Sequence, residues 1–303
     1  MVRIPGGRFT MGSDAHYPEE APAHPVQVDG FWIDRFPVTN RMFARFVRAT
    51  GHVTLAERKP DPAQYPGIQP GMIRAGSLVF VKPDRPVPPT DFTQWWSFRF
   101  GACWRRPSGP GSSLSGCAEH PVVHIAYEDA AAYAAWAGKD LPTEAEWESA
   151  ARGGLEGAAY AWGDELAPRG EMMANYWQGA FPWQNLALDG WEGTSPVGRF
   201  PVNGYGLHDM IGNVWEWTAD WYESGHDPQE SPCCAPRNPR GGAEGRSYDP
   251  CMPEVRIGRK VLKGGSHLCA ANYCQRYRPA ARYPQPIDTS TSHVGFRCVV
   301  RCR

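Results

Sequence analysis

Residues 203–217 read Asn-Gly-Tyr-Gly-Leu-His-Asp-Met-Ile-Gly-Asn-Val-Trp-Glu-Trp, and this stretch is typical of the second half of the chain. Large aromatic side chains alternate with glycine, asparagine and aspartate, which are the residues of tight turns. After about residue 158 helical periodicity is scarce, and segments 261–266 and 294–300 are expected to form two late strands of one sheet. The pattern predicts irregular backbone that buried aromatic rings hold in place.

Helices are expected in the first half of the chain. The first follows an N-capping Thr39 and ends at Gly51, with apolar residues at helical spacing between them. An alanine-rich helix is predicted over 127–137, and another follows Thr143, whose capping box includes Glu146. Short alternating segments predict strands at 8–11, 26–28 and 31–33. The sequence therefore predicts an α+β fold with much irregular backbone, in a single domain over residues 1–303.

Residues from about 59 to 118 form a long connection that is rich in proline and glycine. Only segment 77–81 has the pattern of a strand. Connections of this length are usually functional, as lids or as walls of a binding site. We expect the same of this one.

Composition excludes several classes of protein. The 303 residues carry a formal net charge of −1, so the basic excess of a nucleic-acid-binding protein is missing. No apolar run reaches the roughly 18 residues of a membrane-spanning helix, and the N-terminus lacks the apolar stretch of a signal peptide. Nine cysteines make an odd number in a chain that is not short, which does not suggest a full disulfide framework. A cytoplasmic monomer is expected.

The segment with the clearest chemistry holds Cys269 and Cys274, with four residues between them. Arg276 and Arg278 follow closely, and nearby arginines favour the thiolate form that binds metals. Two thiolates suit a soft ion of low coordination number, above all Cu(I), whereas zinc needs four ligands. The spacing equally allows a structural disulfide or two inert thiols. Adjacent cysteines such as Cys233 and Cys234 do not readily bind one centre.

Oxygen-bearing side chains gather in the glycine-rich turns, at Asn175, Asp189, Asp209 and Glu216. Calcium binds carboxylate, amide and carbonyl oxygens in such backbone. From the residues alone, ordinary turn hydrogen bonds and solvated acids are the better explanation.

Several longer motifs occur in a fixed order along nearly the whole chain. Together they resemble the formylglycine-generating enzyme (sulfatase-modifying factor) family, of the bacterial type. The motifs are residues 4–13 (IPGGRFTMGS), 36–40 (FPVTN), 141–148 (LPTEAEWE), 203–210 (NGYGLHDM), 212–217 (GNVWEW), 264–266 (GGS) and 295–298 (GFRC).

The resemblance implies a variant C-type-lectin-like fold and a copper-dependent oxidase. Its substrate is a cysteine in a Cys-x-Pro-x-Arg segment of an unfolded sulfatase, which O2 converts to formylglycine with loss of sulfide. A thiol reductant supplies the remaining electrons, and neither a nucleic acid nor a membrane takes part.

The resemblance also assigns the site residues. Cys269 and Cys274 are implied to bind Cu(I), with the substrate thiolate as a third sulfur, and Ser266 and Tyr273 to line the pocket for O2 and thiolate. Substrate contacts are expected from Trp215, Arg278 and His293. Position 293 departs from the family, where asparagine is commoner.

Two structural calcium ions follow from the same motifs. The implied ligands are Asn175, the Tyr176 carbonyl, Asp189 and the Trp191 carbonyl at one ion, and Asp209, the carbonyls of Gly212 and Val214, and Glu216 at the other. Animal members use extra disulfides, but Ala151 and Pro279 stand at two of those cysteine positions. This difference fits a reducing bacterial cytoplasm.

Three other functions remain open for such a sequence. A non-haem iron sulfoxide synthase of the same fold would need a compact histidine triad, whereas the nine histidines are scattered. A non-catalytic, calcium-stabilised paralogue or binding module would not need Cys269 and Cys274. A thiol–disulfide oxidoreductase usually has two residues between its cysteines, not four.

Overall fold

The computed structural model describes residues 1–226 and 235–301. Cys233, Cys234 and Cys302 lie outside these ranges. The α-helices in these ranges are α1 (Asn40–Thr50), α2 (Tyr127–Trp136) and α3 (Glu144–Arg152). Within the described ranges, no helix has both the length and the apolar character needed to cross a bilayer.

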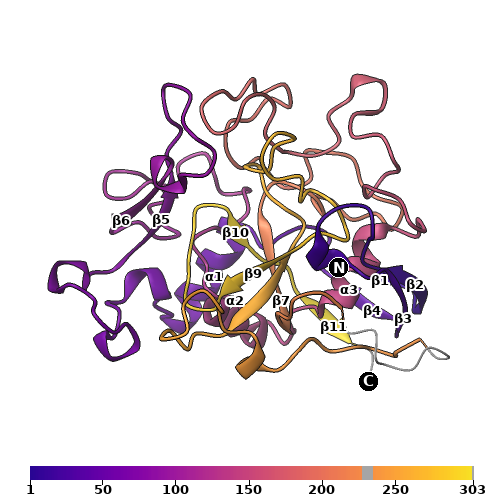
Figure 1. Cartoon of the computed structure of the whole chain (residues 1–303), viewed down its shortest axis with the longest axis horizontal. Helices are drawn as coiled ribbons and strands as arrows, with labels where there is room; N and C mark the ends of the chain where they lie inside the picture. The colour runs from indigo at the N-terminus through magenta and orange to yellow at the C-terminus, as the bar shows by residue number, and fades with distance from the viewer. Residues whose placement is uncertain (227–234, 302–303) are drawn as a thin grey trace.

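A four-stranded sheet lies at the centre of the molecule, in the order β10-β7-β8-β9 (Figure 1). Its strands are β7 (Trp215–Trp221), β8 (Arg259–Lys263), β9 (Arg282–Pro286) and β10 (Val294–Gly295). The β10–β7 pair is parallel, and the other pairs are antiparallel. β7 is almost wholly buried because both of its faces are covered, so its sequence does not alternate between apolar and polar residues.

Two small sheets lie at one end of the molecule. One has the order β1-β4-β11 and the other pairs β2 with β3. The strands are β1 (Val2–Ile4), β2 (Gly7–Met11), β3 (His24–Val28), β4 (Phe31–Ile33) and β11 (Val299–Arg301). The expectation of a single late sheet was wrong for part of segment 294–300. Val294 and Gly295 pair with β7, whereas Val299 pairs with β4, so the segment passes from one sheet to the other.

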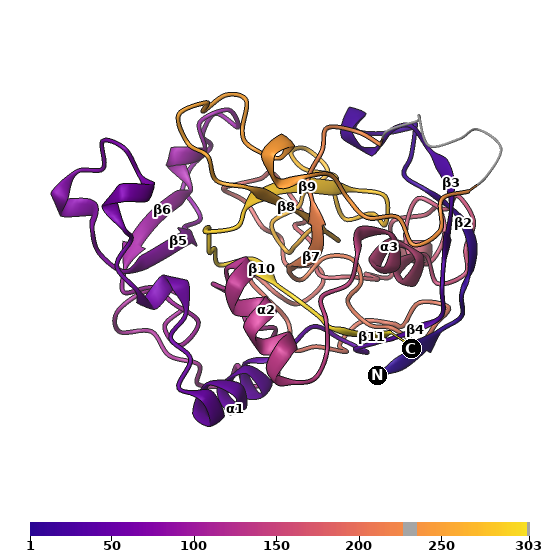
Figure 2. The ribbon, with the colours of Figure 1, turned by 90° about the horizontal axis from the view of Figure 1, so that it is seen from below.

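The helix boundaries predicted from capping residues are confirmed. The Thr39 hydroxyl accepts a hydrogen bond from the backbone N–H of Met42, and Gly51 ends α1 in the left-handed conformation with φ 70°. Thr143 and Glu146 form the capping box of α3. α1 and α2 lie side by side (Figure 2), because Phe43 of α1 stacks on Tyr133 of α2 in the aromatic core.

The proline- and glycine-rich connection contains a hairpin of β5 (Gly76–Phe80) and β6 (Trp96–Phe100). It projects at the end opposite the small sheets in both views (Figures 1 and 2). β6 was missed from the sequence, although Trp-Ser-Phe-Arg-Phe alternates as a strand should, because turn residues crowd around it. Bridges between β5 and segment 290–292 tie the hairpin to the rest of the protein.

Candidate active site

The cysteine pair lies in a pocket of about 600 Å³ that is bounded by elements from distant parts of the chain. The central sheet contributes Trp215 of β7 and Tyr283 of β9, and the hairpin contributes Trp96 of β6. We call this the cysteine pocket. Of the predicted site residues, it brings together Trp215, Ser266, Cys269, Tyr273, Cys274 and His293.

The segment that carries the cysteines folds back on itself after β8. Gly265 has φ 70°, and a Cβ there would lie 2.8 Å from the carbonyl oxygen of Arg276, so only glycine fits this close approach. The backbone N–H of Cys269 donates to the Ser266 carbonyl, and that of Cys274 donates to the Ala270 carbonyl. These turns bring the two Sγ atoms to 3.2 Å as free thiols.

The two thiols have different electrostatic surroundings. Burial raises the pKa of Cys269 well above its ordinary value. The hydrogen bond from Cys269, together with the charge of Arg276, lowers the pKa of Cys274. Of the two thiols, Cys274 therefore ionises more readily to the thiolate, the form that acts as nucleophile and metal ligand.

Arg276 was named only as a neighbour of the cysteines, but it lines the pocket. Its Nη1 lies 3.9 Å from Sγ of Cys274. The guanidinium stacks over the ring of Tyr17, 3.9 Å from its centroid, and donates to Glu19. The N-terminal segment thus fixes the arginine beside the thiolate, a long-range contact that local sequence does not reveal.

Ser266 and Tyr273 form separate parts of the pocket near the thiols. Ser266 is fully buried, and its hydroxyl accepts a hydrogen bond from the backbone N–H of Leu268. The ring of Tyr273 stacks on Phe181 with 4.4 Å between centroids, and Trp95 packs edge-to-face with it. Tyr273 is therefore a rigid wall of the pocket, held by aromatic contacts.

The three residues predicted to contact substrate have different positions. Trp215 and His293 line the pocket, and the His293 ring packs against Trp96 with 4.9 Å between centroids. Burial lowers the pKa of His293 to about 3, which keeps its ring neutral. Arg278 does not line the pocket. It is buried elsewhere in an ion pair with Glu20, because a buried guanidinium requires an opposing charge.

The donor set of the cysteine pocket fits Cu(I). Two thiol sulfurs in contact suit a soft ion of low coordination number. Across residues 1–226 and 235–301, no three His, Cys, Asp or Glu side chains are grouped as metal ligands. The described residues therefore contain no histidine triad of the kind that a non-haem iron site needs.

One atom of the first predicted calcium set lacks a hydrogen-bond partner within the described ranges, whereas the Tyr176 carbonyl of the same set already accepts a hydrogen bond from Gln178. The Oδ1 atom of Asn175 is buried and has no hydrogen-bond partner among the described residues, and an unpaired buried acceptor is costly. Burial raises the pKa of Asp189, whose carboxylate accepts from Gln178 and from the backbone N–H of Trp191. A cation bound at Asn175 would satisfy the unpaired oxygen.

The second predicted calcium set is already hydrogen-bonded within the protein. Both carboxylate oxygens of Glu216 accept hydrogen bonds from Arg297, and one also accepts from the indole of Trp147. The Asp209 carboxylate accepts from the backbone N–H of Gly198. Among the described residues, no fully buried side-chain oxygen of this set lacks a hydrogen-bond partner, so the set stays a prediction from the resemblance.

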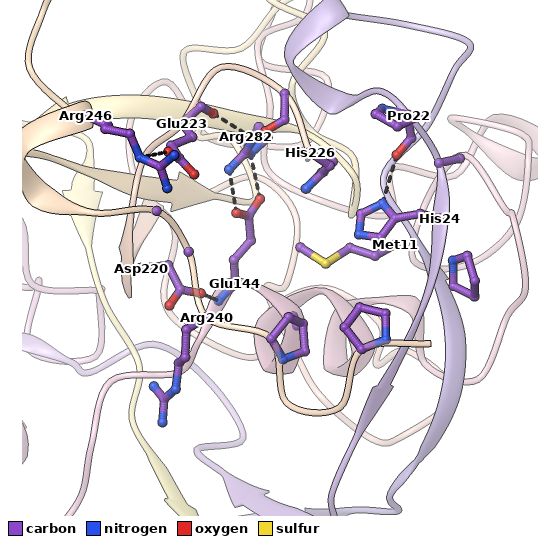
Figure 3. Close-up of a pocket in the computed structure, with 18 of the residues that line it drawn as sticks. Met11, Pro22, His24, Glu144, Asp220, Glu223, His226, Arg240, Arg246 and Arg282 are labelled. Carbon is purple, nitrogen blue, oxygen red and sulfur yellow. Dashed lines mark hydrogen bonds and ion pairs between the residues drawn. The ribbon is translucent and has the colours of Figure 1, made fainter. Parts of the chain in front are cut away.

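A separate pocket of about 480 Å³ lies between β3, α3 and β9 (Figure 3). Arg282 forms two hydrogen bonds with the Glu144 carboxylate, and the Asp220 carboxylate accepts from the Glu144 backbone. Arg246 pairs with Glu223 at its rim. Arg282 and Arg246 are thus already paired with carboxylates, which is typical of a structural network.

Comparisons with known proteins agree with the motif pattern. Residues 1–302 match the model of the sulfatase-modifying factor enzyme 1-like domain. The formylglycine-generating enzyme of Mycobacterium tuberculosis is 55% identical over 301 residues, covering 99% of this chain and 97% of that protein. The enzyme of the same name from Thermomonospora curvata is 47% identical over 303 residues, covering 98% and 92%. Among solved structures, PvdO from Pseudomonas aeruginosa has a TM-score of 0.64 at 24% identity, covering 99% and 93%.

Proposed function

The chain belongs to the family of sulfatase-modifying factor enzymes, and we propose that it converts a cysteine of an unfolded sulfatase polypeptide to formylglycine. The family relation supports an enzyme that modifies a protein cysteine. The finer proposal is a copper-dependent oxidase that uses O2 and a thiol reductant on a Cys-x-Pro-x-Arg segment. The observation that carries it is the contact between two free thiols, Cys269 and Cys274, at the wall of an open pocket.

The proposed reaction balances in atoms and electrons. The substrate thiol, one O2 and two reductant thiols give the aldehyde, hydrogen sulfide, one disulfide and one water. The Cβ–S bond of the substrate breaks after loss of a Cβ hydrogen, and water adds to the thioaldehyde carbon. Two of the four electrons that O2 takes up come from the substrate and two from the thiols.

Cys269 and Cys274 would hold the metal, and Cu(I) bound there would supply the one-electron chemistry that O2 requires. The chain's own residues do the rest. The hydrogen bond from Cys269 and the charge of Arg276 favour the ionised form of Cys274, and Ser266 and Tyr273 shape the space beside the two sulfurs. Trp215 and His293 provide the apolar and neutral polar surfaces on which an extended peptide can lie.

Calcium is proposed at the Asn175 set, where it would satisfy the unpaired amide oxygen, and by resemblance at the Glu216 set. Calorimetric titration with Ca²⁺ after chelation measures the stoichiometry. Two ions support both sets, and a single ion abolished by Asn175→Ala leaves only the first. We place the reaction in a reducing compartment, the cytoplasm, because all six cysteines in the described ranges are free thiols.

The test is to incubate the protein with one equivalent of Cu(I), O2, dithiothreitol and a short Cys-x-Pro-x-Arg peptide, and to follow the peptide mass. We expect the mass to fall by the difference between thiol and aldehyde, and sulfide to appear. The matched control is Cys117→Ala, which removes a thiol outside the cysteine pocket. An unmodified peptide in the presence of bound copper would contradict the proposal and favour a non-catalytic paralogue.

A further inference from the structure

A third pocket, of about 630 Å³, lies between the β5–β6 hairpin and segment 55–72. We call it the hairpin pocket. Leu78 and Thr289 line both this pocket and the cysteine pocket. The two pockets are therefore adjacent and share a wall, with the thiols in the cysteine pocket and the hairpin pocket on the other side of that wall.

One face of the β5–β6 hairpin lines both pockets. Leu78 and Phe98 are paired in the register of the two strands, so their side chains lie on the same face. Trp96 is two residues before Phe98 on β6 and therefore shares that face. Trp96 lines the cysteine pocket and Phe98 lines the hairpin pocket, and about 7 Å of strand separates them.

Hydrogen bonds fix the backbone where the two pockets meet. The backbone N–H of Leu78 donates to the Ser290 carbonyl, and its carbonyl accepts from the N–H of Ser292. The Ser77 hydroxyl also donates to the Ser290 carbonyl. On the far side, Tyr65 is hydrogen-bonded to Asp288, which ties segment 55–72 to the same loop. The shared wall is thus fixed on both sides before any ligand arrives.

The lining of the hairpin pocket favours an apolar occupant. Met72 and Phe98 are 44% and 41% exposed, although they are large apolar side chains. Three basic residues (Arg58, Lys59 and Arg74) and three acidic residues (Asp61, Glu128 and Asp288) line it, so their formal charges cancel. Two of the basic groups already have partners, since Arg58 pairs with Glu128 and Arg74 lies over the Phe100 ring.

We propose that the hairpin pocket is a second subsite for the sulfatase polypeptide, and that it binds an apolar side chain flanking the modified cysteine. This inference rests on the proposed function. An unfolded chain in the cysteine pocket is extended and spans about 3.3 Å per residue, so its flanking residues reach the hairpin pocket within a few positions. A polypeptide presents such a side chain only before it folds, since a folded domain buries it. The subsite therefore adds selectivity for unfolded substrates.

The experiment compares peptides that share the Cys-x-Pro-x-Arg core and are extended by six serines on each side. In a scan, one serine at a time is replaced by leucine. With the wild-type protein we expect one or two adjacent positions to lower KM about fivefold, the effect of burying roughly half a leucine side chain. Turnover numbers should stay within about twofold, because the leucine lies outside the reacting centre.

Phe98→Ser and Met72→Ser should each reduce this leucine advantage to less than about twofold, while kcat/KM for the all-serine peptide stays unchanged. Val202→Ser is the matched control, because Val202 is similarly exposed but lines neither pocket. The two substitutions lie on different elements, and Met72 is in an exposed turn, so loss of folding in one leaves the other informative.

Three results would overturn the inference: no position gives the advantage, the advantage survives both substitutions, or Val202→Ser removes it as well. In each of these cases the all-serine peptide is still converted, so the proposed function stands. If the wild-type protein converts no peptide at all, the proposed function fails, and the subsite fails with it.

Discussion

The cysteine pocket and the ion-pair network around α3 are both rich in ionisable side chains, but they differ in how those groups are paired. In the network, Lys263 pairs with Glu148 at 2.9 Å, and Arg282 pairs with Glu144 through two hydrogen bonds of 2.8 Å. In the pocket, the two cysteine thiols contact each other, Cys274 also lies beside the guanidinium of Arg276, and both cysteines line the open cavity.

The difference shows how this fold separates stability from chemistry. Burial by itself raises the pKa of Glu144, but the charges of Arg282 and Lys263 lower it to about 2, so the carboxylate stays ionised in the interior. Removing one partner of such a buried ion pair costs much stability, and the paired charges do not bind a further group. The thiol pair keeps a readily ionised sulfur at an open pocket, where a metal or a substrate can bind it.

The largest expected effect is the loss of activity when either cysteine is removed. Cys269→Ala and Cys274→Ala should each lower kcat by at least about 10³-fold, because the two thiols act as a unit. The midpoint of thermal unfolding should change by only a few degrees, since each substitution removes one small buried group. Peptide mass spectrometry measures the first quantity and calorimetry the second.

A double variant sharpens this result. If Cys269 and Cys274 act together, removing both should cost no more activity than removing one. An additive loss would mean that the thiols have separate roles, and residual activity of more than about a tenth in either single variant would contradict the assignment.

The next largest effect is expected in the ion-pair network, where a substitution should lower stability and leave activity nearly unchanged. Lys263→Met leaves Glu144 and Glu148 buried without their shared cation, which should lower the free energy of unfolding by about 3 to 5 kcal/mol. Well below the melting temperature, turnover per folded molecule should stay within about twofold. Urea unfolding and peptide turnover on the same sample measure both.

The control for Lys263→Met is Arg246→Met, which breaks the mostly exposed pair with Glu223 and should cost less than about 1 kcal/mol. A loss of activity without loss of stability in Lys263→Met would mean that the network takes part in the reaction, and the contrast between the two regions would no longer hold.

The pH dependence of stability at His124 tests the comparison. The side chain of His124 is as buried as those of the ion-pair network, but its ring is hydrogen-bonded to uncharged groups. Its ring nitrogens contact the Ser77 hydroxyl and the Pro107 carbonyl, and burial lowers its pKa to about 4. An unfolded histidine binds its proton near about pH 6.5, so this stabilisation is present above that pH and is lost as the pH falls toward about 4.

The wild-type protein should therefore lose more stability on acidification than His124→Asn does. The stability gap between the two should narrow by up to about 3 kcal/mol between about pH 7 and pH 4 in urea unfolding. Asparagine suits this position because the backbone of His124 has a positive φ of 61°. A gap independent of pH would show that His124 binds its proton equally readily in the folded and the unfolded states.

Local signals in the sequence predicted much of this fold. Thr39, Gly51 and the Thr143–Glu146 capping box fixed the ends of α1 and the start of α3, because capping depends on neighbouring residues only. The resemblance named seven catalytic and substrate-contact residues, and all of them except Arg278 line the cysteine pocket. The β5–β6 hairpin was half missed, since its strands depend on pairing across a turn-rich segment.

What the sequence did not reveal concerns long-range partners. Arg278 was expected to contact substrate, but Glu20, which lies 258 residues away in sequence, pairs with it inside the protein. Arg276 took the place beside the thiols instead, held by Glu19 of the same N-terminal turn. Which of two nearby arginines faces a pocket depends on the tertiary position of their carboxylates, and the spacing of residues along the chain carries no information about that.

The smallest expected effect is that of substituting His293, which lines the cysteine pocket but is neither one of the thiols nor a member of the ion-pair network. Its ring centroid lies 4.9 Å from that of Trp96, and Nδ1 is hydrogen-bonded to the Thr291 hydroxyl. His293→Asn removes the aromatic contact, which is worth about 0.5 to 1.5 kcal/mol, and should raise KM for a core peptide by roughly two- to tenfold with kcat within about twofold. Thr291→Val keeps the ring and loses only the hydrogen bond, so it should have less effect. A fall in kcat as large as that of the cysteine variants would instead show that His293 takes part in the reaction. The distinction between reactive thiols and an unreactive pocket wall would then be wrong.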